Sequence, residues 1–215
     1  MTWRLPRTVA ALLVLLGAAG CAGGGIVTRS PGATATEASR SQPSSTVGSG
    51  DLAAQKKAAG IADCPASEPS VPARPDGLPD VTLPCLGGGR PVRLAGLRGR
   101  PMIISVWAQW CGPCRTEAPY LSEVAARHPA GVVIMGVDFV DPRPDLAIEF
   151  ARLSGWTYPQ VQDLDKTLAG TLQVSAPPQT ILVDAQGKVV YRHAGPLGST
   201  AELRDLARQH LGVAL

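Results

Sequence analysis

Pro101-Met-Ile-Ile-Ser-Val-Trp-Ala-Gln-Trp-Cys-Gly-Pro-Cys-Arg115 joins a continuous apolar run to two cysteines separated by two residues. The apolar run predicts a buried strand. Helical spacing of the residues that follow predicts a helix from about Pro113 to Arg127. Cys111 would then lie at a helix N-terminus, where unpaired backbone N–H groups favour an anion such as a thiolate. Gly112-Pro113 fits this entry because proline loses no needed N–H in the first turn.

The segments around this motif predict a mixed sheet with helices on its faces. Val132–Val137 is a second apolar run, so strand, helix and strand form a βαβ unit with a parallel strand pair. The chain ends with a β-hairpin, residues 180–184 and 188–192, and a helix opened by Ser199. Between these parts the pattern predicts a helix after Asp141, a short extended piece at 156–161, and a helix to Leu172 capped by Asp165.

Val106–Pro119 resembles the active-site segment of the thioredoxin superfamily. The flanking sequence, from about Pro79 to Leu215, is similar to its extracytoplasmic TlpA/ResA-type thiol-disulfide oxidoreductases. The resemblance implies the thioredoxin fold, an α/β fold whose mixed central sheet is flanked by helices. It also implies a helix–strand insertion between Val137 and Gln173, and a Trp110 that shields Cys111 and offers an apolar contact surface.

A second part of the resemblance is Ala176-Pro-Pro-Gln-Thr180. In the superfamily a cis-proline precedes the hairpin strand and packs opposite the two cysteines, and Pro178 and Thr180 match that pattern. The resemblance therefore implies that a peptide substrate lies along Pro177-Pro178, where the Pro177 carbonyl is available to an extended strand. The alternative is a plain Pro-Pro turn before a strand.

One departure from the family concerns proton transfer. Many thioredoxins carry a buried Asp six residues before the first cysteine, where this chain has Ser105. Serine cannot act as a carboxylate base, so Cys114 needs another proton acceptor. Glu117, three residues after Cys114, is the candidate, and the alternative for Glu117 is a solvated carboxylate on the helix surface.

The N-terminal part predicts export and a lipid anchor. Arg4 and Arg7 precede an 11-residue apolar run, Val9–Ala19. Such a run is shorter than the roughly 20 residues that span a bilayer and is typical of a signal peptide. Ala18-Ala-Gly-Cys21 resembles a lipobox, so Cys21 is expected to carry lipid, with an ordinary cleaved signal or an uncleaved anchor as alternatives.

These segments divide the chain into a lipoprotein signal peptide (1–21), a linker (22–63) and a thioredoxin-like domain (64–215). The linker is rich in Ala, Gly, Ser, Thr and Pro, so it cannot bury enough apolar surface to offset its ordering entropy. We expect a flexible, disordered tether in which Asp51–Ala59 forms at most a transient helix.

Export also implies a compartment where disulfides persist. With Cys21 assigned to lipid and Cys111 expected to pair with Cys114, Cys64 and Cys85 remain. A disulfide between them would close a 22-residue segment and contribute about 3 kcal/mol. Two alternatives stay open, namely that these two cysteines are unpaired, or that all four cysteines bind zinc.

Charge and motifs together narrow the function. Loss of the signal peptide would leave 18 basic and 17 acidic residues, so nothing supports nucleic-acid binding. The resemblance implies thiol-disulfide exchange in which Cys111 attacks and Cys114 resolves, without a metal or organic cofactor. The expected partners are thiols or disulfides of exported proteins, including apocytochrome c, and a membrane protein that supplies electrons.

The expected location is the extracytoplasmic face of the cell membrane. The Gly-Pro pair resembles that of reducing members of the superfamily, and the resemblance implies a reductant of the cytochrome c maturation type. The alternatives are an oxidase that introduces disulfides into exported proteins, a peroxiredoxin-like peroxidase, and a non-catalytic binding module.

Overall fold

The computed structural model describes residues 49–127, 129 and 131–215. The predicted signal peptide, Cys21 and the linker as far as residue 48 lie outside the described residues. The helices are α1 (Ser49–Ala58), α2 (Gly112–Ala126), α3 (Pro144–Leu153), α4 (Leu168–Thr171) and α5 (Thr200–Leu211), with one 3-10 turn, η1 (Leu94–Gly96). The strands are β1 (Thr82–Leu83), β2 (Val92–Arg93), β3 (Met102–Trp107), β4 (Val133–Phe139), β5 (Gln160–Asp163), β6 (Gln179–Val183) and β7 (Val189–Ala194).

The central sheet has five strands in the order β5-β4-β3-β6-β7, and β1 and β2 form a separate antiparallel pair. The strands β3, β4 and β5 are parallel, whereas β6 pairs antiparallel with both β3 and β7. This is the mixed sheet of the thioredoxin fold, with α3 and β5 inserted between β4 and β6, and the predicted fold class is confirmed.

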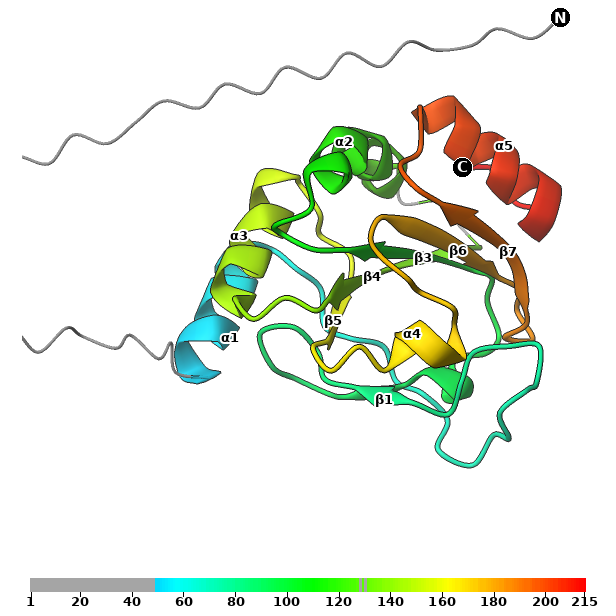
Figure 1. Cartoon of the computed structure of the whole chain (residues 1–215), viewed down its shortest axis with the longest axis horizontal. Coiled ribbons are helices and arrows are strands. Elements are labelled where there is room, and N and C mark those ends of the chain that lie inside the picture. The colour runs from blue at the N-terminus through cyan, green and yellow to red at the C-terminus, as the bar shows by residue number, and fades with distance from the viewer. Residues whose placement is uncertain (1–48, 128, 130) are drawn as a thin grey trace, which may run out of the picture. The chain divides into compact units, whose positions relative to one another are not determined.

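β3 is buried on both faces, which explains its continuous apolar sequence. Ile103 and Trp107 point to a core shared with α2, α3 and α5, while Ile104 and Val106 point to a core shared with β1, β2 and α4. Figure 1 shows α2 and α5 on one side of the sheet and α4 with β1 on the other. The strand that leads to Cys111 is therefore held from both sides.

The helix α1 differs from the expectation of a transient helix within a flexible linker. Leu52 packs against the core, and the Lys56 side chain is only 6% exposed. After the helix, Ile61 is buried and the Ala62 N–H donates to the Thr157 carbonyl at 2.8 Å. The described part of the predicted linker, from Ser49 on, is thus packed on the domain. Its few apolar side chains and the Lys56 stem are buried there by contacts with segments distant in the sequence, which a local sequence pattern does not indicate.

The predicted cap of α4 is also corrected. Asp163, two residues earlier than the expected Asp165, accepts hydrogen bonds from the backbone N–H groups of Thr167 at 2.7 Å and Leu168 at 2.9 Å. The observed helix is short, Leu168–Thr171, and Leu164 before it is 53% exposed.

Candidate active site

The two cysteines of the motif form a disulfide at the start of α2. Cys111 is the N-cap residue, and its sulfur accepts a hydrogen bond from the Cys114 backbone N–H at 3.2 Å. Gly112 and Pro113 form the first turn, and the helix runs through Pro119 to Ala126. The helix N-terminus thus directs an N–H group at the Cys111 sulfur, and this stabilises a thiolate there when the disulfide opens.

Two groups after β4 hold the loop before Cys111. The Asp141 carboxylate accepts a hydrogen bond from the Gln109 N–H at 2.9 Å, and the Trp110 indole N–H donates to the Val140 carbonyl at 3.1 Å. Trp110 is 51% exposed, whereas Cys111 is 3% exposed. The indole therefore offers an apolar surface beside an almost buried sulfur.

Glu117 is fully buried, so the alternative of a solvated carboxylate is wrong. One carboxylate oxygen accepts a hydrogen bond from the Leu197 N–H at 2.9 Å, and the other has no partner among the described residues. Burial raises the pKa of Glu117 to about 7, although the bond from Leu197 opposes the shift. One helical turn after Cys114, Glu117 can therefore hold or release a proton near neutral pH.

Asp138 and Asp141, both almost completely buried, form an acidic pair that sequence reasoning missed. Burial, reinforced by the neighbouring Asp141 carboxylate, raises the pKa of Asp138 well above its usual range. Asp138 lies beside Trp107 in the parallel register of β3 and β4. The position of these residues in the sequence could have indicated them. The carboxyl ends of adjacent parallel strands meet at one edge of the sheet, so acidic residues at the end of the second strand lie near the Cys111 loop that follows the first.

The peptide bond between Pro177 and Pro178 is cis. Antiparallel register pairs Gln179 of β6 with Val106 of β3, so Pro178 lies at the end of β3 from which the Cys111 loop departs. The Pro178 carbonyl accepts a hydrogen bond from the Gly195 N–H at 3.0 Å. Thr180 pairs with Ser105, and both buried hydroxyl groups lack a partner within the described part of the chain.

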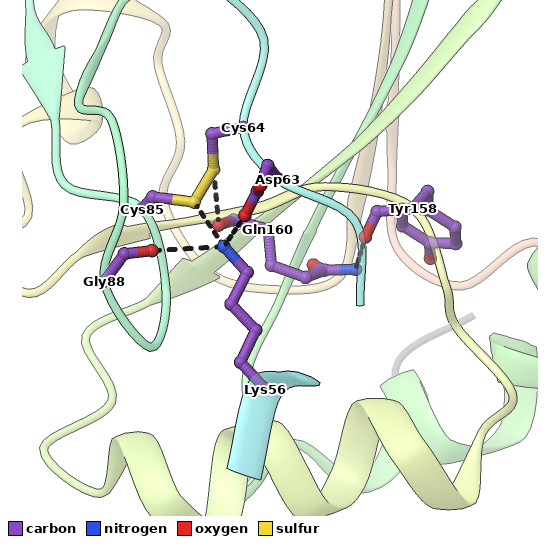
Figure 2. The surroundings of a disulfide bond; sticks show 7 residues. All are labelled: Lys56, Asp63, Cys64, Cys85, Gly88, Tyr158 and Gln160. Atoms are coloured by element: carbon purple, nitrogen blue, oxygen red, sulfur yellow. Dashed lines mark hydrogen bonds and ion pairs between the residues drawn. A yellow bond between two sulfur atoms is a disulfide. The ribbon is translucent and has the colours of Figure 1, made fainter. Parts of the chain in front are cut away.

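The remaining two predicted cysteines, Cys64 and Cys85, form a second disulfide at another place in the fold. Cys85 forms an isolated antiparallel backbone pair with Val161 of β5. β5 is an edge strand of the sheet, and β4 separates it from β3, which leads to Cys111. Figure 2 shows the Lys56 ammonium directed at this disulfide, 3.1 Å from the Cys85 sulfur. The fold therefore brings together Trp110 to Cys114, Glu117, Pro178 and Thr180, and leaves Cys64 and Cys85 apart from them.

The fold and the paired cysteines at a helix N-terminus define the class: this is a thiol-disulfide oxidoreductase of the thioredoxin superfamily, similar to its TlpA/ResA-type members. Residues 76–192 match the AhpC/TSA family, and the chain belongs to that family.

Individual relatives agree with this assignment. Thiol:disulfide interchange protein DsbE of Pseudomonas fluorescens biotype C is 30% identical over 133 residues, which cover 62% of this chain and 73% of that protein. A DsbE homolog of Paracoccus denitrificans is 38% identical over 96 residues, covering 44% of this chain and 51% of the homolog. The structure of MTB dsbF, in mixed oxidized and reduced forms, superposes with a TM-score of 0.54 at 28% identity, covering 61% of this chain and 94% of that one.

Proposed function

We propose that this oxidoreductase is a lipid-anchored protein on the extracytoplasmic face of the membrane that reduces disulfides of exported proteins. The observation that carries the proposal is the Cys111 sulfur at the N-cap of α2, with the Cys114 N–H directed at it. Such an arrangement stabilises the thiolate, which is the nucleophile in disulfide exchange.

The exchange proceeds in two steps that move two electrons. The Cys111 thiolate attacks one sulfur of the substrate disulfide, forms a mixed disulfide and expels the other substrate sulfur as a thiolate. Cys114 then attacks the Cys111 sulfur, which releases the second substrate thiol and leaves the Cys111–Cys114 disulfide. A dithiol of a membrane partner would restore the reduced pair.

Glu117 is the proposed proton acceptor for Cys114. A resolving thiol must lose its proton before it attacks, and Ser105 offers no carboxylate for this purpose. Glu117 lies one turn further along α2, and its pKa of about 7 allows it to exchange a proton near neutral pH. Asp141 acts as a positioning residue through its bond to the Gln109 N–H.

The proposed substrate surface combines Trp110 with Pro177 and Pro178. The exposed indole supplies an apolar contact, and the cis-proline segment lies at the same end of β3 as Cys111. The Pro178 carbonyl is engaged by Gly195, whereas the described residues provide no hydrogen-bond donor to the Pro177 carbonyl, which suits an incoming peptide strand. Thr180, the second residue of β6, pairs with Ser105 of β3 behind this surface.

The direction of transfer and the location rest on resemblance and on the N-terminal sequence. Gly112-Pro113 is similar to reducing members of the superfamily, and apocytochrome c is the proposed substrate on the same ground. The signal-like run before Cys21 supports export and lipidation. Among the described residues, no helix combines the length and apolar character needed to cross a bilayer.

Trapping of the mixed disulfide tests the function directly. We expect Cys114→Ser to accumulate covalent complexes with exported proteins, because Cys111 still attacks but nothing resolves the intermediate. Non-reducing gel electrophoresis and mass spectrometry would detect them, and Cys111→Ser is the matched control that forms none. Absence of complexes from a folded Cys114→Ser protein would contradict the proposal, and a strongly oxidising measured potential would favour disulfide introduction instead.

A further inference from the structure

The second disulfide has a buried ammonium group beside it. Lys56 is almost completely buried, and its ammonium group lies within reach of three acceptors: the Cys85 sulfur at 3.1 Å, the Gly88 carbonyl at 3.1 Å and the Asp63 carboxylate at 3.3 Å. An ammonium has three donors, so one of them is directed at sulfur. A disulfide sulfur is a weak acceptor, whereas a thiolate is a strong, charged one.

The other sulfur has the opposite kind of neighbour. The Cys64 sulfur lies 3.2 Å from the Gln160 backbone carbonyl, which also accepts a hydrogen bond from the Leu86 N–H. A disulfide sulfur carries no proton and cannot use this carbonyl. A Cys64 thiol could donate a hydrogen bond to the second lone pair of the Gln160 carbonyl oxygen. The two sites therefore match the reduced pair, with a neutral thiol at Cys64 and a thiolate at Cys85.

Cys64 and Cys85 are almost completely buried, at 5% and 4% exposed, and the glycine loop after Cys85 borders a surface pocket beside the Cys85 sulfur. This pocket is lined by Lys56, Asp63 and Gly87 to Gly89. A Cβ built at Gly89 would lie 3.9 Å from the Cys85 sulfur and 3.6 Å from the Lys56 nitrogen. Glycine keeps that space open next to the disulfide.

We propose that Cys64–Cys85 is a second redox-active pair, opened by an external dithiol and held in its reduced form by the Lys56 ammonium. The attacking thiolate forms a mixed disulfide with the Cys64 sulfur, and the electron pair of the broken S–S bond leaves on Cys85 as a thiolate. The second thiol of the attacker then displaces Cys64, which leaves as a thiol. The dithiol is oxidised to a disulfide, and the protein gains two electrons and the proton on Cys64.

This inference goes beyond the proposed function and is tested independently of Cys111. The full-length protein is equilibrated with mixtures of reduced and oxidised dithiothreitol, the thiols are trapped by alkylation, and mass spectrometry of peptides follows each cysteine pair separately. We expect Cys64–Cys85 to open in the folded protein, and Lys56→Met to shift its equilibrium at least about tenfold towards the disulfide, because the thiolate loses its counter-charge. Lys57→Met, which changes an exposed neighbour, is the matched control and should shift it less than about twofold.

A second variant covers the case in which Lys56→Met does not fold. Asp63→Asn removes a carboxylate that is 94% exposed and competes with Cys85 for Lys56, so it should shift the equilibrium towards the dithiol. In the reduced wild-type protein, Cys85 should also be alkylated faster than Cys64. A disulfide that opens only on unfolding, or equal equilibria for the Lys56 and Lys57 variants, would overturn the proposal.

Discussion

Glu117 shows how one buried carboxyl group can connect stability with reactivity. Its folded-state pKa of about 7 lies above the ordinary value of 4.5. The folded protein therefore binds this proton more tightly than the unfolded chain does. The contribution of Glu117 to the free energy of unfolding is retained below about pH 4.5 and falls as pH rises to about 7 and beyond.

We expect Glu117→Gln to remove this pH dependence. From pH 4 to pH 8 the wild type should lose on the order of 3 kcal/mol of unfolding free energy relative to the variant, since one pKa unit corresponds to about 1.4 kcal/mol. Denaturant unfolding across this pH range measures it. Glu123→Gln is the control on the same helix. The hydrogen bond from the Thr200 hydroxyl, aided by Arg127 and Arg204, lowers the pKa of Glu123. The wild type should therefore gain stability relative to Glu123→Gln as the pH rises, which is the opposite of the Glu117 result.

The same variant tests the proposed proton transfer. If Glu117 accepts the Cys114 proton, the pH–rate profile of disulfide reduction should lose a step near pH 7 in Glu117→Gln. An unchanged profile would remove Glu117 from the mechanism and leave only its role in stability.

The short helix α4 depends on one buried side chain that precedes it. Asp163, 1% exposed, accepts hydrogen bonds from the Thr167 hydroxyl at 2.6 Å and from the backbone N–H groups of Thr167 and Leu168. It thereby satisfies donors that a helix start leaves unpaired. The helix begins with Leu168, whose side chain is fully buried in the core shared with β1 and β2.

We expect Asp163→Ala to lower the free energy of unfolding by about 2 kcal/mol, because it removes the cap and leaves donors unsatisfied. Asp165→Ala, at the exposed position that the local pattern favours as a cap, should change it by less than about 0.5 kcal/mol. Urea denaturation of both variants measures the difference. Equal effects would contradict the assignment of the cap.

As a whole, the described chain is a sheet covered on both sides, with the Cys111–Cys114 pair at the end of a central strand and Cys64–Cys85 beside an edge strand. The α1 segment packs against α3, so the described unit includes residues before the predicted boundary at 64.

We expect Cys21→Ser to release the protein from the membrane fraction, because lipid attachment needs the thiol of that residue. Cell fractionation, with intact-mass measurement of the mature N-terminus, checks this outcome. Cys64→Ser serves as the control, since it removes a different cysteine and leaves the N-terminal segment unchanged. Membrane association that survives the loss of Cys21 would argue against the lipid anchor.

Features that depend on neighbours in the sequence could be predicted from the chain alone. The strand before Cys111, the helix entry through Gly112-Pro113 and the hairpin of β6 and β7 each follow from local apolar periodicity and turn chemistry. The element order predicts a mixed sheet flanked by helices, and the resemblance of Val106–Pro119 to the thioredoxin superfamily adds the particular fold.

Features that depend on contacts between distant parts of the chain could not be predicted from the sequence alone. Glu117 is bonded to Leu197, 80 residues away, and Lys56 contacts Cys85, 29 residues away. Whether a charged side chain is solvated or buried depends on which segments cover it after folding, and no local pattern contains that information. The raised pKa of Glu117 and the ammonium beside the second disulfide therefore arise from the packing of the folded chain.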